Sequence, residues 1–275
     1  MKSILRNVNC IICGNSKTVF FAEKDGMSVR KCSECGLIFT NPRKDQNIEE
    51  NIYSSPDYFE SYFQSKQVHE EKRFKNRISE LKKLKPDGRI LDVGCGLGFF
   101  LDIAGKSGYE TYGIEISPFA CEYAKYRLNL KVFRGDISDF KASRGSFDII
   151  TLWHVLEHSP DPGYLLKKVS FYLKKNGILA IEIPNVGSFM AKIASKNWEL
   201  LSPAEHLYYF TFETLKQLLK QSGFFVIDQH TYLWTTPAML WGRVFAPFSI
   251  FRFKKLPFFI KGDVMVIYAG KAGEE

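Results

Sequence analysis

The sequence lacks an uncharged apolar run of 18 residues, which is about the length that a helix needs to cross a lipid bilayer. Its first residues, Met1 to Arg6, also lack the apolar stretch of a secretory signal peptide. Only two of the six cysteines, Cys95 and Cys121, lie outside a pair of C-x-x-C motifs, so a disulfide framework is not indicated. These absences lead us to expect a cytoplasmic protein whose thiols stay reduced.

A further deficit is local, because residues 229–262 contain no aspartate or glutamate. The same segment carries five lysine or arginine residues and nine aromatic residues. A basic, aromatic insert suits a membrane surface or a lipid-linked acceptor, so peripheral membrane association is one expectation. The composition also fits a buried helical hairpin or a dimer contact, and less well a nucleic-acid site where aromatic rings stack on bases.

The chain is long enough, at 275 residues, for one large α/β domain with a small appendage. Its apolar content of 45% and charged content of 25% are typical of a soluble globular protein. The net charge of +8 favours anionic partners such as nucleic acid, nucleotide sugars or lipid phosphates, without choosing among them.

Four cysteines near the start are spaced as zinc ligands. Cys10 and Cys13 form one C-x-x-C pair, Cys32 and Cys35 form the other, and 18 residues separate the pairs. Four thiolates around Zn²⁺ leave no open position, so such a site is structural. We predict a zinc ribbon over residues 1–42, stabilised mostly by its metal. The ribbon either packs on the main domain and orients substrate or contacts nucleic acid.

Residues 43–87 are expected to form a linker and a leading helix. The first part, residues 43–66, is polar with interleaved aromatic residues, and suits either a packed segment or a lid over the active site. From Val68 to Leu84 apolar residues recur on one helical face, and Pro86-Asp87-Gly88 ends the helix.

A glycine-rich turn follows the first apolar strand of the main domain. The strand, residues 89–94, leads into Gly94, Gly96 and Gly98, and then into helix-forming residues. Glycines let the backbone pass close to a ligand, and the helix start offers unpaired N–H groups. The turn therefore predicts a cradle for a nucleoside-bearing cofactor. On this turn alone, NAD and other cofactors remain open, although position 99 is Phe where the dinucleotide fingerprint has Gly or Ala.

Apolar strands alternate with helical stretches from residue 88 onward, which indicates parallel βαβ units. After the first strand, we expect strands at 110–115, 131–134, 147–153, 178–183, 224–228 and 263–269. Thr211 is expected to cap the helix that begins after it, and Gly223 to end that helix.

Three features resemble the motifs of class I S-adenosylmethionine (SAM)-dependent methyltransferases. They are the D-V-G-C-G turn, Glu115 at the end of the second strand and Asp136 after the third. The resemblance covers roughly residues 70–270 and implies a Rossmann-like, doubly wound α/β fold with strand order 3-2-1-4-5-7-6, residues 88–275 forming the domain. It implies that Glu115 binds the ribose hydroxyls, Asp136 the adenine amino group, and the backbone after it a ring nitrogen. Asp148 matches a position that braces the fold. The implied SAM-binding residues are Asp92, Gly94, Cys95, Gly96, Glu115, Ile116, Asp136, Ile137 and Trp153.

The stretch from Trp153 to Pro162 resembles the H-V-L-E-H-x-x-D-P loop of small-molecule methyltransferases, which include ubiquinone-pathway and sugar enzymes. We name His154 and His158 as candidate bases, since a histidine near pH 7 can take a proton from an attacking oxygen or nitrogen. The alternative is a structural role, in which the histidines only pack under the cofactor. A variant seen in related O-methyltransferases is a divalent ion, for which His154, Glu157, His158 and His206 are the candidates.

Residues 198–210 resemble a subfamily pattern and lie where such folds bind the acceptor. His206 and Tyr208 are the candidates there; alternatively, Glu205 and His206 only fix the loop. We therefore expect a SAM-dependent methyltransferase with structural Zn²⁺ that acts on a small-molecule or glycan acceptor, such as a nucleotide- or lipid-linked sugar. An RNA methyltransferase that holds RNA with its ribbon, and a non-catalytic SAM-binding scaffold, are the alternatives.

Overall fold

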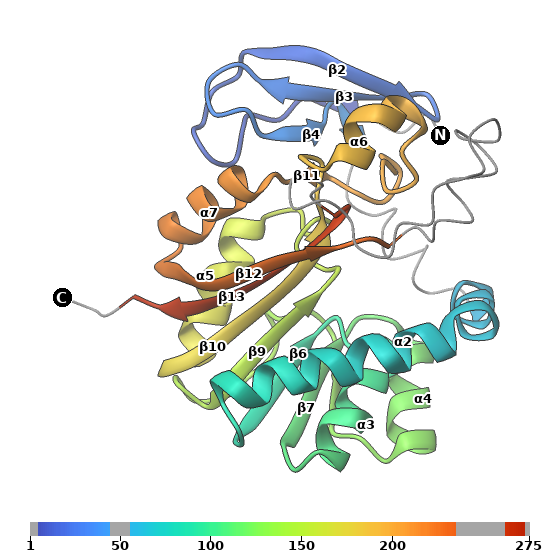
Figure 1. Ribbon diagram of the computed structural model, residues 1–275, viewed down its shortest axis with the longest axis vertical. Helices are drawn as coiled ribbons and strands as arrows, with labels where there is room; N and C mark the ends of the chain where they lie inside the picture. The colour runs from blue at the N-terminus through green and yellow to red at the C-terminus, as the bar shows by residue number, and fades with distance from the viewer. Residues whose placement is uncertain (1–4, 45–55, 235–261, 273–275) are drawn as a thin grey trace, which may run out of the picture.

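The computed structural model describes residues 5–44, 56–234 and 262–272, with the side chains of the leading helix described from Glu70 onward (Figure 1). Most of the acid-free insert, residues 235–261, and the aromatic side chains proposed for a lid lie outside the described residues. Among the described residues, no helix is long and apolar enough to span a membrane.

A mixed sheet of seven strands forms the centre of the main domain. It is ordered β12-β13-β10-β9-β6-β7-β8, so that, numbered in chain order, its strands run 3-2-1-4-5-7-6 from β8 to β12. Six strands run in the same direction, whereas β13 runs antiparallel to both of its neighbours, β10 and β12. The strands are β6 (Arg89–Val93), β7 (Glu110–Glu115), β8 (Val132–Arg134), β9 (Phe147–Trp153), β10 (Leu173–Pro184), β12 (Phe224–Tyr232) and β13 (Val264–Lys271).

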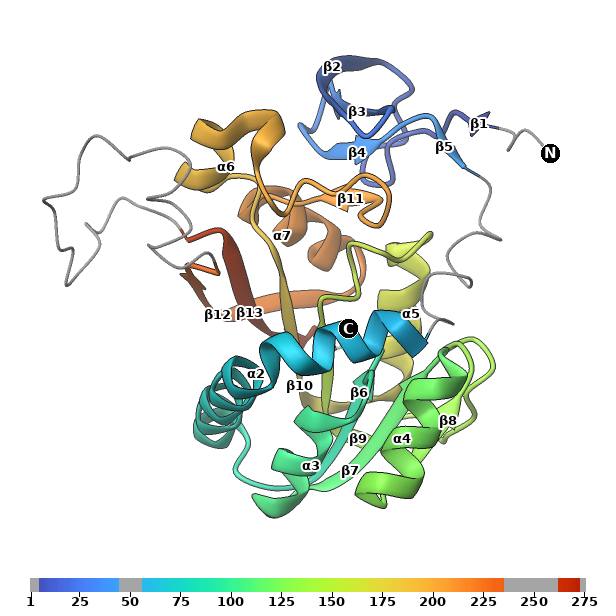
Figure 2. The same cartoon turned by 90° about the vertical axis from the view of Figure 1, so that its right-hand side faces the viewer.

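Helices cover both faces of this sheet, because alternate residues of a strand point to opposite sides. Ile90 packs with α2 (Pro56–Leu84), α3 (Phe99–Lys106) and α4 (Pro118–Leu128). Its neighbour Leu91 packs on the other face, with α5 (Pro162–Tyr172) and α7 (Phe212–Gln221). Figures 1 and 2 show the resulting three layers, with α2 crossing the sheet.

Local sequence signals set most helix starts. Ser117 caps α4 and is followed by a proline at the first helical position, and Asp161 and Pro162 repeat this arrangement at α5. Thr211 caps α7 through a reciprocal pair with Thr214, as predicted. Helix α6 (Phe189–Ala194) is followed directly by the 3₁₀ turn η2 (Ser195–Asn197).

The N-terminal residues form a second, smaller sheet. It contains β2 (Thr18–Lys24), β3 (Met27–Cys32), β4 (Ile38–Thr40) and, from far along the chain, β11 (Tyr208–Tyr209). A separate short pair joins β1 (Leu5–Arg6) to β5 (Arg43–Lys44). The ribbon lies beside α6 at one end of the molecule (Figures 1 and 2). Since β11 completes its sheet, the ribbon is built into the main domain.

Two elements begin earlier than predicted. The leading helix α2 begins at Pro56, so part of the stretch predicted as a polar linker is helical. Strand β10 begins at Leu173 rather than at Ile178, because a register shift carries its pairing with β9 back to Phe147. The residues between these positions are polar, so the apolar pattern of the sequence did not predict this part of the strand.

Candidate functional site

A cavity of about 410 Å³ opens where β6, β7 and β9 end. This is the carboxyl edge of the parallel strands, where ligands bind in open α/β sheets. Its volume lies within the usual range for a small-molecule site. The predicted residues that line it are Asp92, Gly94, Cys95, Gly96, Glu115, Ile116, Trp153, His154, His158 and His206.

The glycine turn forms one wall of the cavity. Gly94 has φ +71°, and a Cβ added there would lie 2.7 Å from Cγ2 of Val155. The turn is held by Ile114, whose carbonyl accepts from Gly94 N at 2.8 Å and from Cys95 N at 3.0 Å. Only a residue without a side chain therefore allows the turn to run this close to the loop after β9.

Two buried carboxyl groups stand behind the turn. Glu115 accepts from the backbone N–H of Gly96 and of Ser117, both at 2.8 Å. Asp92 accepts from the Thr151 hydroxyl at 2.6 Å. Burial raises the pKa of Asp92 to about 8, and the neighbouring Glu115 adds to the rise. A ligand with hydroxyl groups or a positive charge would favour the ionised forms of both groups.

Of four further predicted residues, two line the cavity and two do not. Ile116 lines it and is 44% exposed, an apolar surface open to a ligand. Trp153 also lines it, and its buried indole N–H has no hydrogen-bond acceptor among the described residues. Asp136 and Ile137 do not line the cavity. Asp136 is exposed and accepts from Ser138 N at 2.8 Å, whereas Ile137 is buried in the core.

His154 lies between two buried carboxylates and is therefore a poor candidate for a base. Its Nδ1 is 3.1 Å from Glu157 and its Nε2 is 3.3 Å from Glu182. Burial disfavours the charged ring, but hydrogen bonds and ion pairing with the two carboxylates outweigh it and raise the pKa of His154 to about 9. At neutral pH the ring is a cation without a lone pair to accept a proton.

Glu182 connects this histidine to helix α2, a connection that the motif argument did not find. Arg73 and Arg77 both donate to the Glu182 carboxylate, Arg77 Nε at 2.6 Å, and the Tyr232 hydroxyl donates at 2.8 Å. Arg73 also lines the cavity. The sequence did contain a signal for this connection, namely a single glutamate within the apolar part of strand β10. A charged residue in a buried strand indicates partners of opposite charge.

His158 and His206 come from distant segments and meet at the cavity. Their ring centroids are 4.8 Å apart in an edge-to-face arrangement. His158 Nδ1 is 3.0 Å from the Glu205 carbonyl and His206 Nδ1 is 2.9 Å from the Leu200 carbonyl. A carbonyl only accepts, so Nδ1 carries the proton in both rings and the neutral form has its lone pair on Nε2.

Both of these histidines are held neutral. Burial lowers the pKa of His158 to about 4, and the nearby His206 contributes although Glu157 opposes the shift. Burial also lowers the pKa of His206, against the opposing charge of Glu157. A neutral imidazole at pH 7 is the form that can accept a proton.

Glu157, His158 and His206 also form a compact set of ligand types. One ligand atom of each lies within 4.8 Å of the others, and Glu157 Oε2 is buried without a hydrogen-bond partner among the described residues. The fourth candidate for a divalent ion, His154, is not part of this set. Tyr208 was predicted on the acceptor side but does not line the cavity, because its hydroxyl donates to the Pro160 carbonyl at 3.3 Å.

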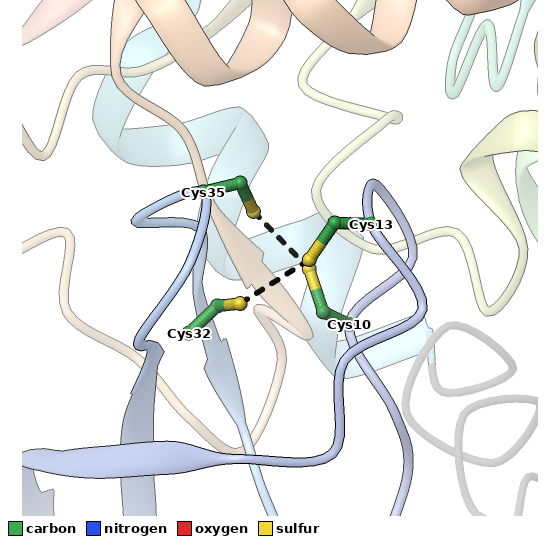
Figure 3. Close-up of side chains that lie close together, drawn as sticks. All are labelled: Cys10, Cys13, Cys32 and Cys35. Carbon is green, nitrogen blue, oxygen red and sulfur yellow. Dashed lines mark hydrogen bonds between the residues drawn. The ribbon is translucent and has the colours of Figure 1, made fainter.

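The four N-terminal cysteines converge as predicted (Figure 3). Their sulfur atoms all lie within 4.8 Å of one another, with Cys10 and Cys35 at 3.3 Å and Cys13 and Cys32 at 3.4 Å. The turns that carry them close through hydrogen bonds from Gly14 N to Cys10 O and from Gly36 N to Cys32 O. The cluster is compatible with a tetrahedral Zn²⁺ site.

The sequence of this chain is similar to those of a known family and of known enzymes. A family described as a methyltransferase domain matches residues 63–229. Ubiquinone biosynthesis O-methyltransferases of Xanthomonas campestris and Coxiella burnetii are 30% and 34% identical, over 36% and 33% of the chain. The matches cover 44% and 41% of those enzymes, so the chain spans less than half of their length.

Solved structures share the fold at low identity. A SAM-dependent methyltransferase from Archaeoglobus fulgidus has a TM-score of 0.60 and 20% identity, covering 78% of this chain and 98% of that one. The 1,6-didemethyltoxoflavin-N1-methyltransferase of Burkholderia thailandensis, solved with its acceptor and S-adenosylhomocysteine, has a TM-score of 0.56 and 15% identity, covering 92% and 99%. The family match places the chain in the methyltransferase-domain family, and the solved structures show that it has the fold of SAM-dependent methyltransferases.

Proposed function

We propose that this enzyme methylates a hydroxyl or other protonated nucleophile of a small-molecule acceptor, with His158 or His206 as the base. The observation that carries the proposal is the placement of two neutral histidines in the same cavity as the glycine turn. The similarity to ubiquinone biosynthesis O-methyltransferases supports a small molecule as the acceptor. A glycan, as in a nucleotide- or lipid-linked sugar, is a narrower form of the same proposal.

The residues present suit SAM. Bound SAM would supply a methyl group on an activated sulfonium centre. Gly94 leaves room for the cofactor, the ionised Glu115 can still accept from ribose hydroxyls, and Asp92 would favour the cationic amino group. The exposed Asp136 and the backbone of Ile137, whose side chain is buried, remain proposed adenine contacts just after β8. The cationic ring of His154 stays bound to its carboxylates and positions the loop.

Proton removal is the part of the reaction assigned to the histidines. With SAM bound, the new O–C bond would replace the S–C bond of the sulfonium, whose electron pair stays on sulfur. The O–H bond of the acceptor would break, and its proton would pass to the Nε2 lone pair. The carbonyl that accepts from Nδ1–H stabilises the resulting imidazolium, as an orienting group does in general base catalysis. Such a base contributes typically about 10²–10⁴-fold to the rate.

A divalent ion is a second use of the same corner of the cavity. Glu157, His158 and His206 have the atom types that bind such ions, and a bound ion would lower the pKa of an acceptor hydroxyl. The buried, unpartnered Oε2 of Glu157 favours this variant. Activity measured with EDTA and with added Mg²⁺ or Mn²⁺ separates it from base catalysis by histidine alone.

The N-terminal cysteine cluster is proposed to hold structural Zn²⁺ through Cys10, Cys13, Cys32 and Cys35. All four positions would be taken by thiolates, so the ion would supply stability and no reaction chemistry. The exposed member, Cys13, and the three less exposed members come from two hydrogen-bonded turns, which suits a closed site.

Labelled SAM, incubated with cell extract divided into small-molecule, glycan, lipid and RNA fractions, tests the proposal. We expect label in the small-molecule or glycan fraction, and loss of that label with His158→Gln or His206→Gln while S-adenosylhomocysteine still binds. Label in RNA alone would establish the RNA alternative. Cofactor binding without labelling of any fraction would establish the scaffold alternative.

A further inference from the structure

We propose that Thr40 of the ribbon is a positioning residue for His206, so that the ribbon holds the acceptor side of the active site. The proposal rests on the proposed function in one respect, namely that His206 acts on the acceptor. No ribbon residue lines the catalytic cavity among the described residues, so any influence of the ribbon on catalysis passes through an intermediate group.

The first observation is that residues 198–210, which we call the acceptor loop, complete the ribbon's sheet through β11. Strand β11 pairs antiparallel with β4, with Tyr208 opposite Phe39 and Tyr209 opposite Ile38. His206 is two residues before β11, at the point where the chain enters this pairing. The position of β4 therefore sets where the backbone of the loop runs as it leaves the cavity.

The second observation is that Thr40 binds two successive carbonyls of that loop. Its hydroxyl donates to His206 O at 2.9 Å, and its backbone N–H donates to Leu207 O at 3.0 Å. Thr40 is 1% exposed, so neither bond is replaced readily by water. Loss of a buried hydrogen bond leaves the remaining acceptor unsatisfied, which is costly.

The third observation is that Glu157, in the loop after β9, holds the same backbone from the other side. Leu207 N and Tyr208 N donate to Glu157 O at 2.9 and 3.2 Å, and His206 N donates to Ser202 O at 2.7 Å. The segment with His206 is thus clamped between Thr40 and the loop that carries His158. The distance between the two histidines depends on both sides of this clamp.

The rest of the acceptor loop also rests on the ribbon. Lys24 Nζ donates to the Trp198 carbonyl at 3.2 Å. Three ribbon residues, Ala22, Val29 and Ile38, share one apolar cluster with Trp198, Leu201 and Tyr209. Leu200, whose carbonyl accepts from His206 Nδ1, packs against this cluster. Backbone and ring of His206 are therefore both held by groups that the ribbon supports.

Thr40→Val tests the clamp, because valine keeps the β-branch and the backbone N–H but removes the hydroxyl donor. Thr40→Ser restores the donor. Thr18→Val is the matched control, because it removes a hydroxyl from a half-buried position of β2. That hydroxyl accepts from Arg30 Nε at 3.2 Å and does not contact the acceptor loop. All variants are compared in the metal-loaded full chain at a temperature where circular dichroism shows them folded.

The readout is the imidazole of His206, followed by NMR on protein with ¹⁵N-labelled histidine. With Thr40→Val we expect its Nδ1–H signature to weaken, because the hydrogen bond to the Leu200 carbonyl depends on the position of the His206 backbone, while S-adenosylhomocysteine affinity stays within about twofold. Thr40→Ser and Thr18→Val should retain the wild-type spectrum. This readout needs no acceptor, so a failure of the proposed function would not affect it.

Three outcomes would overturn the proposal. One is an unchanged His206 spectrum in Thr40→Val, and another is an equal change in Thr18→Val, which would indicate general destabilisation of the ribbon. The third is failure of Thr40→Ser to restore the spectrum. Once the acceptor is identified, Thr40→Val should lower turnover about tenfold, and Thr40→Ser should restore it.

Discussion

The Nε2 atom of His154 lies 3.3 Å from a carboxylate oxygen of Glu182, a side chain with no exposed surface. Replacing this cation by a neutral group, His154→Gln, leaves Glu157 without its charged partner. We expect the free energy of unfolding at pH 7 to fall by about 3 kcal/mol, the order found when a buried ion pair loses one member. Urea denaturation measures it. His230→Gln is the control, because His230 lies 3.5 Å from Glu80 at a partly exposed site and should cost under about 1 kcal/mol.

The same ion pairs predict a loss of stability at high pH. The pKa of His154 is raised to about 9 from its ordinary 6.5, so the folded state holds a proton that the unfolded state releases. The stabilisation is complete below pH 6.5 and is lost as pH rises through 9. The difference in unfolding free energy between wild type and His154→Gln should therefore shrink as pH rises from 6.5 to 9. A constant difference from pH 6 to 10 would contradict the assignment.

His158 predicts the opposite dependence on the acid side. Its pKa is lowered to about 4, so between pH 6.5 and 4 the unfolded state binds the proton more readily and stability falls as pH falls. Glu157 favours the charged ring, whereas burial and the positive forms of His206 and His154 oppose it. NMR titration should show His158 neutral at pH 5. A midpoint near 6.5 would contradict the lowering of the His158 pKa by burial.

Glu115 should control cofactor affinity. Glu115→Gln keeps the shape but replaces a charged acceptor of the Gly96 and Ser117 N–H groups by a neutral one. Hydrogen bonds to charged groups contribute about 1.5–3 kcal/mol, so S-adenosylhomocysteine should bind on the order of 10- to 100-fold more weakly. Calorimetry measures this. Glu110→Gln at the exposed start of the same strand should bind as wild type, and equal losses in both variants would refute a local role.

Gly94 allows steric and conformational effects to be separated. Gly94→Ala places a Cβ 2.7 Å from Val155 at φ +71°, whereas Gly108→Ala, at φ +96°, meets nothing within 4 Å. Both should lose about 1–2 kcal/mol through the unfavourable φ. Only Gly94→Ala should also weaken S-adenosylhomocysteine binding, because the turn must move away from Val155. Unaltered binding by Gly94→Ala would show that the turn is not the cofactor cradle.

Removal of the proposed zinc should destabilise the whole enzyme. Cys10 and Cys32 pack in the same buried cluster as Leu152 and Leu166, and Gln221 Nε2 donates to Ile12 O at 3.0 Å. Cys13→Ser should therefore lose bound zinc by elemental analysis and melt at a lower temperature in one transition. Cys121→Ala should keep its zinc. A separate early transition of the ribbon, with an unchanged main transition, would contradict this coupling.

Short-range patterns predicted much of the sheet. Strands β7 and β9 begin and end where apolar periodicity places them, and the glycine turn, Glu115 and Trp153 meet in one cavity. The cysteine pairs converged because each C-x-x-C lies on a tight local turn. These signals depend on neighbouring residues, which is why the sequence contains them.

Long-range pairings could not be predicted in this way. Nothing near Tyr208 indicates that it pairs with β4 rather than contacting the acceptor, and nothing near His154 shows that Glu182 will hold its charge. Both histidines after β9 matched the motif equally. Glu157 of the same loop and Glu182 of β10 raise the pKa of His154, whereas burial lowers that of His158, so the distinction between cation and base exists only in the folded protein.

The pairing of β4 with β11 also has a consequence during translation. Ile38 leaves the ribosome about 170 residues before its partner Tyr209, an interval on the order of 10 s at ordinary synthesis rates. Throughout that interval the ribbon lacks its fourth strand and the apolar surface that covers Cys10 and Cys32. Early metal capture would keep the four thiols from oxidation and the open strand edge from aggregation until the last third of the chain arrives.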